Sequence, residues 1–355
     1  MLSKPSPAPS RKRPSQVSLH DIARICSLSV MTVSRALSGK GAVHPKTRER
    51  VLAAARKMSY VPNRLATNFW KQKTHSVGVL IPDIEHSIFP AVVRGIESVL
   101  SGANYHLYLS CSYDNPHREQ EEVQAMLERR VDGILLAPSS MKESVATVSR
   151  IRTLGCPFVL LDRLIPDLEA DAVTVDDYAG AFAAVTHLAK QGYRRILHLA
   201  GPADIWTCAE RERGYRAALE KAGLEFRPGD VVHTGLSVED GETAMVRILD
   251  GAPLHADAVF CVNDPVAVGA FKTLRKCGLR VPSDLGLVGF SGTLESEIME
   301  TPLTTVRQEA RLIGQRAAQI LLSRMTSETP GGESPLHEVV PTTLLVRESS
   351  LRKTQ

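Results

Sequence analysis

Residues 18–37 read SLHDIARICSLSVMTVSRAL, and this stretch decides how the N-terminal part of the chain folds. Ser18 and Asp21 have the spacing of a capping box, so the sequence predicts that a helix begins directly after Ser18. Ser29 follows a tight break and is expected to cap a second helix, in which apolar residues repeat at helical spacing. Two short helices joined by such a turn form a helix-turn-helix, whose second helix enters the major groove of DNA.

A third helix is expected from Pro45, which suits the first turn of a helix. Helical pattern alone would also fit any small three-helix packing unit, but charge favours DNA binding. Residues 1–75 hold 15 Lys and Arg against 2 Asp and Glu, a formal charge of +13, whereas the remainder holds 28 against 37, a charge of −9. A basic segment beside an acidic remainder is typical of phosphate binding, because an ordinary solvated surface mixes both signs.

Four segments together resemble the N-terminal module of the lactose-repressor (LacI-type) family of bacterial transcriptional regulators. They are residues 21–23 (DIA), 32–37 (TVSRAL), 47–51 (TRERV) and 60–66 (YVPNRLA). The resemblance covers about residues 17–348, and it implies a helix-turn-helix DNA-binding domain at 16–61 and a hinge helix and linker at 62–75. Residues 1–15, rich in Pro and Ser, are expected to be a disordered basic tail.

The exposed residues of the second helix are expected to read DNA, and by resemblance they occupy the reading positions of the family. Arg35 can form a bidentate contact with guanine, and Val30 and Met31 offer apolar contact to a thymine methyl group. The alternative for Met31 is partial burial in the core. Contacts to phosphate, which position the protein without reading sequence, are expected from Ser18, Ser29, Thr32, Ser34 and Lys40.

The resemblance implies that the hinge becomes helical on DNA and enters the minor groove. Asn63, Leu65 and Ala66 belong to the matching motif. Phe69 stands where the family usually has the leucine that wedges between base pairs. This departure leaves open whether Phe69 enters DNA or packs against the rest of the chain.

Residues 76–348 alternate short apolar strands with helices of about a dozen residues, a pattern typical of βαβ units and parallel sheets. The pattern restarts after residue 162, which predicts two doubly wound parallel-sheet α/β halves with a ligand between them. This is the periplasmic-binding-protein-like architecture, and it is also the sensor of the family. The expected lobes are residues 76–161 plus 291–324 and residues 162–290 plus 325–348, with one last strand at 339–346.

Candidate effector-binding residues follow from the rule that ligands of open α/β sheets sit at the carboxyl ends of the strands. The rule selects residues that come directly after predicted strands: Asp83, Asp162, Arg163, Asp264 and Ser291. The resemblance adds Phe89 and Arg211, and makes Arg211 and Asp264 the leading pair. Trp206 is expected to stack on a sugar ring or to pack in its own loop. An arginine fork and a carboxylate suit a sugar, a sugar acid or a similar polyol, although the leading pair would also fit an interlobe salt bridge.

Other classes of site find little support in the sequence. None of the six cysteines pairs at CxxC spacing, which argues against a zinc site and a disulfide framework. The sequence contains no P-loop, GxSxG or HExxH motif, so neither an enzyme nor a cofactor is expected. No apolar run approaches the roughly 18 residues that span a membrane, and the N-terminus does not read as a signal peptide.

We therefore expect a homodimeric repressor, cytoplasmic and associated with the nucleoid, that binds a pseudo-palindromic operator and responds to a small metabolite. An activator or a co-repressor-dependent regulator of the same family stays open. A solute-binding protein would share the sensor, but the basic N-terminal segment opposes it. A sugar-processing enzyme would need a catalytic constellation.

Overall fold

The structure of the chain is a computed structural model that describes residues 17–39, 41, 43–60, 73–85, 88–251, 255–327 and 334–352. The predicted tail and most of the predicted hinge lie outside these residues. So do five candidate DNA contacts: Lys40, Asn63, Leu65, Ala66 and Phe69. The chain divides into two compact units, Met1–Gln72 and Lys73–Gln355.

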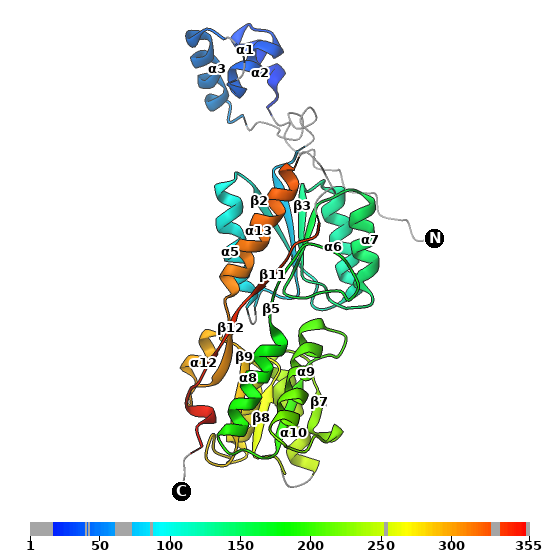
Figure 1. Cartoon of the computed structure of the whole chain (residues 1–355). Helices are drawn as coiled ribbons and strands as arrows, with labels where there is room; N and C mark the ends of the chain where they lie inside the picture. The colour runs from blue at the N-terminus through cyan, green and yellow to red at the C-terminus, as the bar shows by residue number, and fades with distance from the viewer. Residues whose placement is uncertain are drawn as a thin grey trace, which may run out of the picture. The chain divides into compact units, whose positions relative to one another are not determined.

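The described part of the first unit contains α1 (Leu19–Cys26), α2 (Val30–Ser38) and α3 (Pro45–Lys57), drawn in blue in Figure 1. The predicted capping box is present, because Asp21 N donates to Ser18 Oγ over 3.3 Å and Ser18 N donates to Asp21 Oδ2 over 3.0 Å. Ser29 caps α2 by accepting from Thr32 N over 3.2 Å. The three helices pack around small and branched apolar side chains: Ile22, Ala23, Cys26, Val33, Ala36, Val51 and Ala55.

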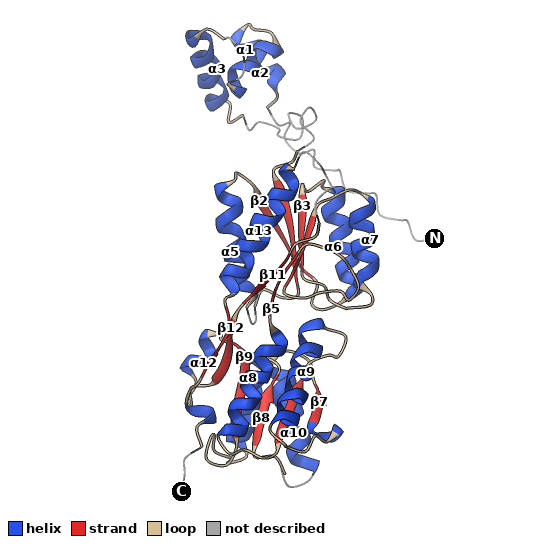
Figure 2. Cartoon of the chain, viewed as in Figure 1, coloured by secondary structure: helices blue, strands red, loops and turns tan. Residues whose placement is uncertain are grey.

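The second unit holds two six-stranded sheets, each with helices on both faces (Figure 2). We call the lobe around the first sheet the N-lobe. Its strand order is β11-β5-β4-β3-β1-β2, and all neighbouring strands are parallel. The strands are β1 (Ser76–Ile81), β2 (His106–Cys111), β3 (Gly133–Leu136), β4 (Phe158–Leu161), β5 (Ala172–Val175) and β11 (His337–Val340).

Helices α5 (Phe89–Gly102) and α13 (Ala310–Thr326) cover one face of the N-lobe sheet, and α6 (Pro116–Glu128) and α7 (Ser144–Thr153) cover the other (Figure 1). Glycines allow α5 and α13 to approach closely. A Cβ atom on Gly95 would lie 2.1 Å from the backbone oxygen of Arg311, and one on Gly314 would lie 2.0 Å from that of Val92. Any side chain at these positions would push the two helices apart.

The lobe around the second sheet is the C-lobe, with strand order β12-β10-β9-β8-β6-β7. Only β12 is antiparallel to its neighbour. Its strands are β6 (Ile196–Ala200), β7 (Val231–His233), β8 (Ala258–Cys261), β9 (Gly286–Ser291), β10 (Thr304–Gln308) and β12 (Thr342–Leu345). Its helices are α8 (Asp177–Lys190), α9 (Trp206–Lys221), α10 (Val238–Gly251), α11 (Asp264–Lys276) and α12 (Leu294–Ile298), with 3₁₀ turns at Pro228–Asp230 and Glu348–Ser350.

The predicted lobe boundaries are wrong in three places, because the chain crosses between the lobes after β5, after β10 and between β11 and β12. Residues 291–308 belong to the C-lobe, whereas β5 and β11 belong to the N-lobe. The single strand predicted at 339–346 is two strands in different sheets. Pro341 stands between them and has no N–H to continue a ladder, and strands of four residues are too short for their periodicity to assign them to a sheet.

Among the residues that the structure describes, no helix is long and apolar enough to cross a membrane. Within the same residues, no cluster of His, Cys, Asp and Glu side chains is arranged to hold a metal ion. The six cysteines are free thiols.

Candidate functional site

Helix α2 presents two of its three predicted reading residues, Met31 and Arg35, to solvent. Met31 is 64% exposed, so the alternative of a buried Met31 is wrong. Arg35 is exposed one turn further along the same helix, whereas Val30 is half-buried and packs partly against the core. An exposed apolar side chain beside an exposed guanidinium can read both a thymine methyl group and a guanine edge.

The predicted phosphate contacts among the described residues also build the helix ends. Ser18 Oγ donates to Asp21 Oδ2 over 2.7 Å, and Ser29 Oγ lies 2.8 Å from Thr32 Oγ1. Ser34 is half-buried on α2. Ser29 and Thr32 lie at the N-terminus of α2 and Ser18 at the N-terminus of α1, and this end of a helix favours anions such as phosphate.

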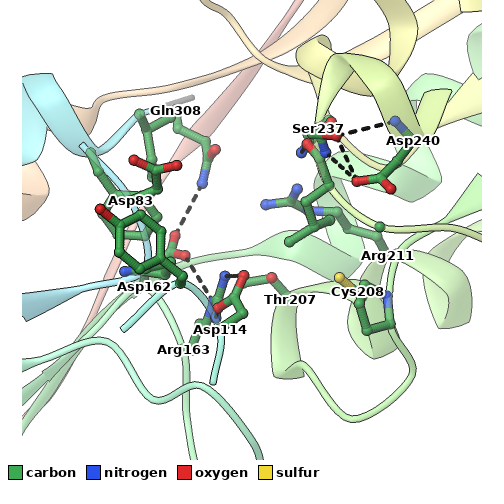
Figure 3. Close-up of a pocket in the computed structure, with 18 residues that line it drawn as sticks. Asp83, Asp114, Asp162, Arg163, Thr207, Cys208, Arg211, Ser237, Asp240 and Gln308 are labelled. Atoms are coloured by element: carbon green, nitrogen blue, oxygen red, sulfur yellow. Dashed lines mark hydrogen bonds and ion pairs between the residues drawn. The ribbon is translucent and has the colours of Figure 1, made fainter. Parts of the chain in front are cut away.

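A cavity of about 330 Å³ lies between the N-lobe and the C-lobe of the second unit (Figure 3). Its walls come from loops at the carboxyl ends of strands in both sheets, where the sequence placed a ligand. Figure 3 shows Asp83, Asp162 and Gln308 grouped on one side, facing Arg211 and Asp240 on the other. The remaining lining residues are Pro82, Ile88, Phe89, Tyr113, Asp114, Arg163, Pro202, Thr207, Cys208, Gly235, Leu236, Ser237 and Asn263.

Arg211, on α9, reaches the cavity as half of a buried ion pair. Its Nε donates to Asp177 Oδ1 over 2.8 Å, and its NH1 donates to the backbone oxygen of Val262 over 2.7 Å. The guanidinium also lies 3.8 Å from the centre of the Phe290 ring. Burial raises the pKa of Asp177 above its ordinary value, and the positive charge of Arg211 opposes that rise. Asp177 is a site residue that residue spacing did not indicate, because it opens α8 and follows no strand whose end was predicted.

Arg163 is the second buried guanidinium at the cavity. Its NH1 donates to the Asp114 carboxylate and to the backbone oxygen of Pro138, the latter over 3.1 Å, and Asp162 lies 3.9 Å from its Nε. Burial raises the pKa of Asp162, and the nearby arginines oppose that rise. Asp114 was also missed, although it lies three residues after β2 and satisfies the strand-end rule.

Five of the predicted effector residues line this cavity: Asp83, Phe89, Asp162, Arg163 and Arg211. Trp206, Asp264 and Ser291 do not. Asp264 is 0% exposed, with its carboxylate accepting from Thr305 Oγ1 over 2.6 Å and from Thr293 N over 2.8 Å. The expected pairing of Arg211 with Asp264 is therefore wrong. Asp264 is the first residue of α11, and its side chain points toward the sheet. It joins the helix to Thr293, after β9, and to Thr305, in β10.

Asn263, one residue earlier, is the lining residue that this part of the sequence contributes. Its Oδ1 accepts from Val266 N over 2.8 Å, which caps α11, and its Nδ2 donates to the backbone oxygen of Leu236 over 2.9 Å. Trp206 opens α9, and Thr207, Cys208 and Arg211 of that helix face the cavity instead. The signal that could have found Asn263 is its position directly after β8 at the N-cap of a helix.

Two polar contacts join the lobes beside the cavity. Gln308 Nε2, at the end of β10, donates to Asp162 Oδ1 over 3.5 Å. Ser140, after β3, donates through Oγ to the Asp204 carboxylate, and Met141 N donates to the backbone oxygen of Asp204 over 2.9 Å. We call the contact between residues 140–141 and Asp204 the interlobe clasp. Both contacts require the lobes to be close together.

Both units of the chain match families of known proteins. The model of "Bacterial regulatory proteins, lacI family" matches residues 18–63, and that of "Periplasmic binding protein-like domain" matches residues 185–350. The chain is 34% identical over 329 residues to the HTH-type transcriptional repressor CytR of Escherichia coli (strain K12), covering 92% of this chain and 95% of CytR. It is 33% identical over 347 residues to the HTH-type transcriptional regulator CelR of Thermobifida fusca, covering 96% and 99%.

Among solved structures, a complex of the transcriptional regulator CelR with cellobiose superposes with a TM-score of 0.71 at 30% identity. The match covers 94% of this chain and 100% of that chain. Identity of this level over nearly the full length of relatives that share one architecture establishes membership. The chain belongs to the lacI family of bacterial regulatory proteins and is a DNA-binding transcriptional regulator.

Proposed function

We propose that the protein is a repressor whose affinity for its operator is controlled by a small hydroxylated metabolite, of the sugar or sugar-acid class, bound in the cavity between the lobes. The observation that carries this proposal is that both lobes contribute polar side chains to one cavity, among them Asp162 from the N-lobe and Arg211 from the C-lobe. A ligand that contacts both lobes binds one relative arrangement of the lobes better than others. It therefore shifts the population toward that arrangement.

The chemistry of the lining supports a ligand with several hydroxyl groups. The guanidinium of Arg211 is held in place by its bond to Asp177 and can donate to a ligand hydroxyl. Asp83, Asp162 and Asp240 supply carboxylate oxygens that can accept from ligand hydroxyls. Phe89 and Tyr113 add aromatic surface for the apolar face of a ring. A cavity of about 330 Å³ lies at the small end of the range for small-molecule sites, which fits a sugar of one or two rings.

On the DNA side, we propose that Arg35 and Met31 read bases while Ser18, Ser29, Thr32 and Ser34 hold phosphates. A homodimer would present two such helices to a pseudo-palindromic operator, with half-sites related by the two-fold axis of the protein. The names of CytR as a repressor and of the CelR complex as one with cellobiose support a repressor that answers to a sugar. We further propose that the protein acts in the cytoplasm, bound to the bacterial chromosome, and that it catalyses no reaction.

The test begins with an operator obtained by selecting binding sequences from random duplexes with the full-length protein. Fluorescence anisotropy then measures operator affinity with and without each sugar that raises the melting temperature, since a ligand of the native state stabilises it. We expect a symmetric operator and a change of at least tenfold in its affinity on adding the ligand. A ligand that binds without changing operator affinity, or a selection that enriches no sequence, would contradict the proposal.

A further inference from the structure

We infer that the cavity selects an uncharged, hydroxyl-rich ligand over the phosphorylated or carboxylated forms of that ligand, an inference that rests on the proposed effector role of the cavity. The charge of the lining carries it. Four aspartates and two arginines line the cavity and leave a formal charge of −2: Asp83, Asp114, Asp162, Asp240, Arg163 and Arg211.

Both arginines already have carboxylate partners of their own. Arg211 is paired with Asp177, with 7% and 1% of their side chains exposed. Arg163, whose side chain is 4% exposed, is paired with Asp114 and lies against Asp162. Sites that bind phosphate or carboxylate use the guanidinium charge to pair with the ligand. Here that charge is already neutralised by the protein, while donors on both guanidinium groups can still serve a neutral oxygen.

Two carboxylates at the cavity have no cation beside them among the described residues. Asp83 Oδ1 accepts only from the backbone N of Glu85, over 2.9 Å. Asp240 Oδ2 accepts from Ser237 N over 2.9 Å and from Ser237 Oγ over 2.7 Å. The oxygens left over can accept hydrogen bonds from ligand hydroxyls. Against a phosphate or a carboxylate they exert repulsion, which a partly desolvated cavity strengthens.

Helix N-termini do not reverse this balance. Four helices begin at the cavity. In α10 and α11 the Ser237 and Asn263 side chains already accept from first-turn N–H groups, whereas α5 and α9 have no side-chain cap, and each such uncapped end is equivalent to about +0.5 elementary charge. Two of them supply about +1 against the −2 of the lining. Pro90, in the first turn of α5, also removes one N–H donor from that end.

The uncharged side chains fit the same ligand. Asn263 and Gln308 offer amide groups, which can both donate to and accept from a ligand hydroxyl. Tyr113, 57% exposed, stands at the cavity with the Arg118 guanidinium 4.6 Å from its ring centre. Ile88 and Phe89 complete an apolar wall beside the carboxylates. Hydroxyl groups on one side and ring carbons on the other are the pattern of a neutral sugar.

The experiment titrates the full-length protein with matched sets of probes by calorimetry. The sets are ribose with ribose 5-phosphate, glucose with gluconate and glucose 6-phosphate, and cellobiose with cellobionate. In every set that binds, we expect the neutral member to bind at least tenfold more tightly than its anionic partner. An anionic member that binds as tightly as its neutral parent would overturn the inference and leave the proposed function intact. Sets that all fail to bind would contradict the proposed function itself.

A pair of variants tests the electrostatic cause. Asp83→Asn removes one charge at the cavity at constant shape, so it should reduce the preference for the neutral member severalfold. Glu121→Gln removes one charge from an exposed position on α6, where 66% of the side chain is accessible, and should leave the preference unchanged. An unchanged preference in Asp83→Asn, or an equal reduction in both variants, would overturn the assignment of selectivity to the cavity carboxylates.

Discussion

Arg211 and Asp177 form a buried ion pair in the wall of the cavity, with Nε and Oδ1 separated by 2.8 Å. The pair joins α9 to the first residue of α8, directly after the chain crosses into the C-lobe. The same arginine binds the end of β8 through Val262 and lies over Phe290 of β9. One side chain therefore connects the crossing segment, the C-lobe sheet and the cavity.

Removing only the arginine should destabilise the second unit, because it leaves Asp177 buried without its partner. We expect Arg211→Met to lower the free energy of unfolding by about 3 kcal/mol, the cost of breaking a buried pair on one side. Adding Asp177→Asn to Arg211→Met should restore part of that loss, since the second change removes the unpaired charge. Urea unfolding of Arg211→Met, of Asp177→Asn alone and of the double variant measures this. Additive losses in the double variant would show that the two residues do not act as a pair.

The buried imidazole of His198 should make the stability of the C-lobe depend on pH. It is 0% exposed in β6, donates through Nδ1 to Phe260 O over 3.0 Å and stacks on the Phe260 ring. Burial lowers its pKa from 6.5 to about 4. The unfolded chain therefore takes up a proton first as pH falls, so the contribution of the neutral ring is complete above pH 6.5 and is lost toward pH 4.

We expect the stability difference between the natural protein and His198→Gln to shrink by up to about 3 kcal/mol between pH 7 and pH 4. His117→Gln is the control, because 80% of that side chain is exposed on α6. Chemical unfolding at a series of pH values gives both curves. A difference for His198→Gln that stays constant across the range would contradict a buried neutral imidazole.

Asp264 and Asn263 are neighbours with opposite expected roles. Asp264→Ala leaves Thr305 Oγ1 and Thr293 N without their acceptor, so we expect a loss of about 3 kcal/mol in stability and less than a threefold change in ligand affinity. Asn263→Asp keeps a helix cap, but it replaces the amide that faces the cavity and loses the bond from Nδ2 to Leu236 O, so it should weaken ligand binding and also cost about 1–3 kcal/mol in stability. Calorimetric titration and urea unfolding separate the two; a loss of ligand binding at full stability in Asp264→Ala would contradict this assignment.

Residue spacing predicted what depends on local chemistry. The capping box at Ser18 and Asp21 requires only the residues between them, and the strand-end rule placed Asp83, Asp162 and Arg163 on the cavity because it describes the topology of every parallel sheet. Arg211 followed from the family resemblance and from no local rule. The capping box and the strand-end residues share one feature, which is that each is decided within a few residues or by a rule common to the fold.

The errors arose where tertiary contacts decide. Asp264 satisfies the strand-end rule as well as Asn263 does, but the first turn of α11 directs one side chain toward the sheet and the other toward the cavity. The pairing of Asp177 with Arg211 joins positions 34 residues apart, which no spacing rule connects. The crossing at Pro341 was missed because residues 339–346, with β-branched and apolar side chains on both sides of the proline, resemble one strand. Their spacing does not show where one sheet ends and the next begins.

Replacing Arg35 should reduce sequence specificity without abolishing affinity for DNA. Arg35→Ala should cost about 1–3 kcal/mol at one base position of each half-site and leave the others unchanged, because a bidentate contact to guanine reads a single base pair. Salt-dependent binding to unrelated DNA should persist, since it comes from the remaining positive charge. Lys57→Ala, at the C-terminal end of α3, removes an exposed positive charge remote from the N-terminus of α2 and serves as the control. Unaltered discrimination at every base position in Arg35→Ala would contradict the reading role.

Removing the interlobe clasp tests whether ligand affinity depends on closure of the lobes. Asp204→Ala removes the acceptor of Ser140 Oγ but keeps the bond from Met141 N to the backbone of residue 204. If the ligand binds the closed arrangement, this change lowers the closed population and weakens ligand binding by the same factor, which we expect to be several-fold. Ser140→Ala removes the same interlobe contact and also the acceptor of Lys142 N and Glu143 N, so it should weaken ligand binding at least as much. Adding Asp204→Ala to Ser140→Ala should weaken binding no further, and Ser149→Ala, on the exposed face of α7, is the control. Ligand affinities measured by titration decide this, and additive losses in the double variant would show that Ser140 and Asp204 act separately.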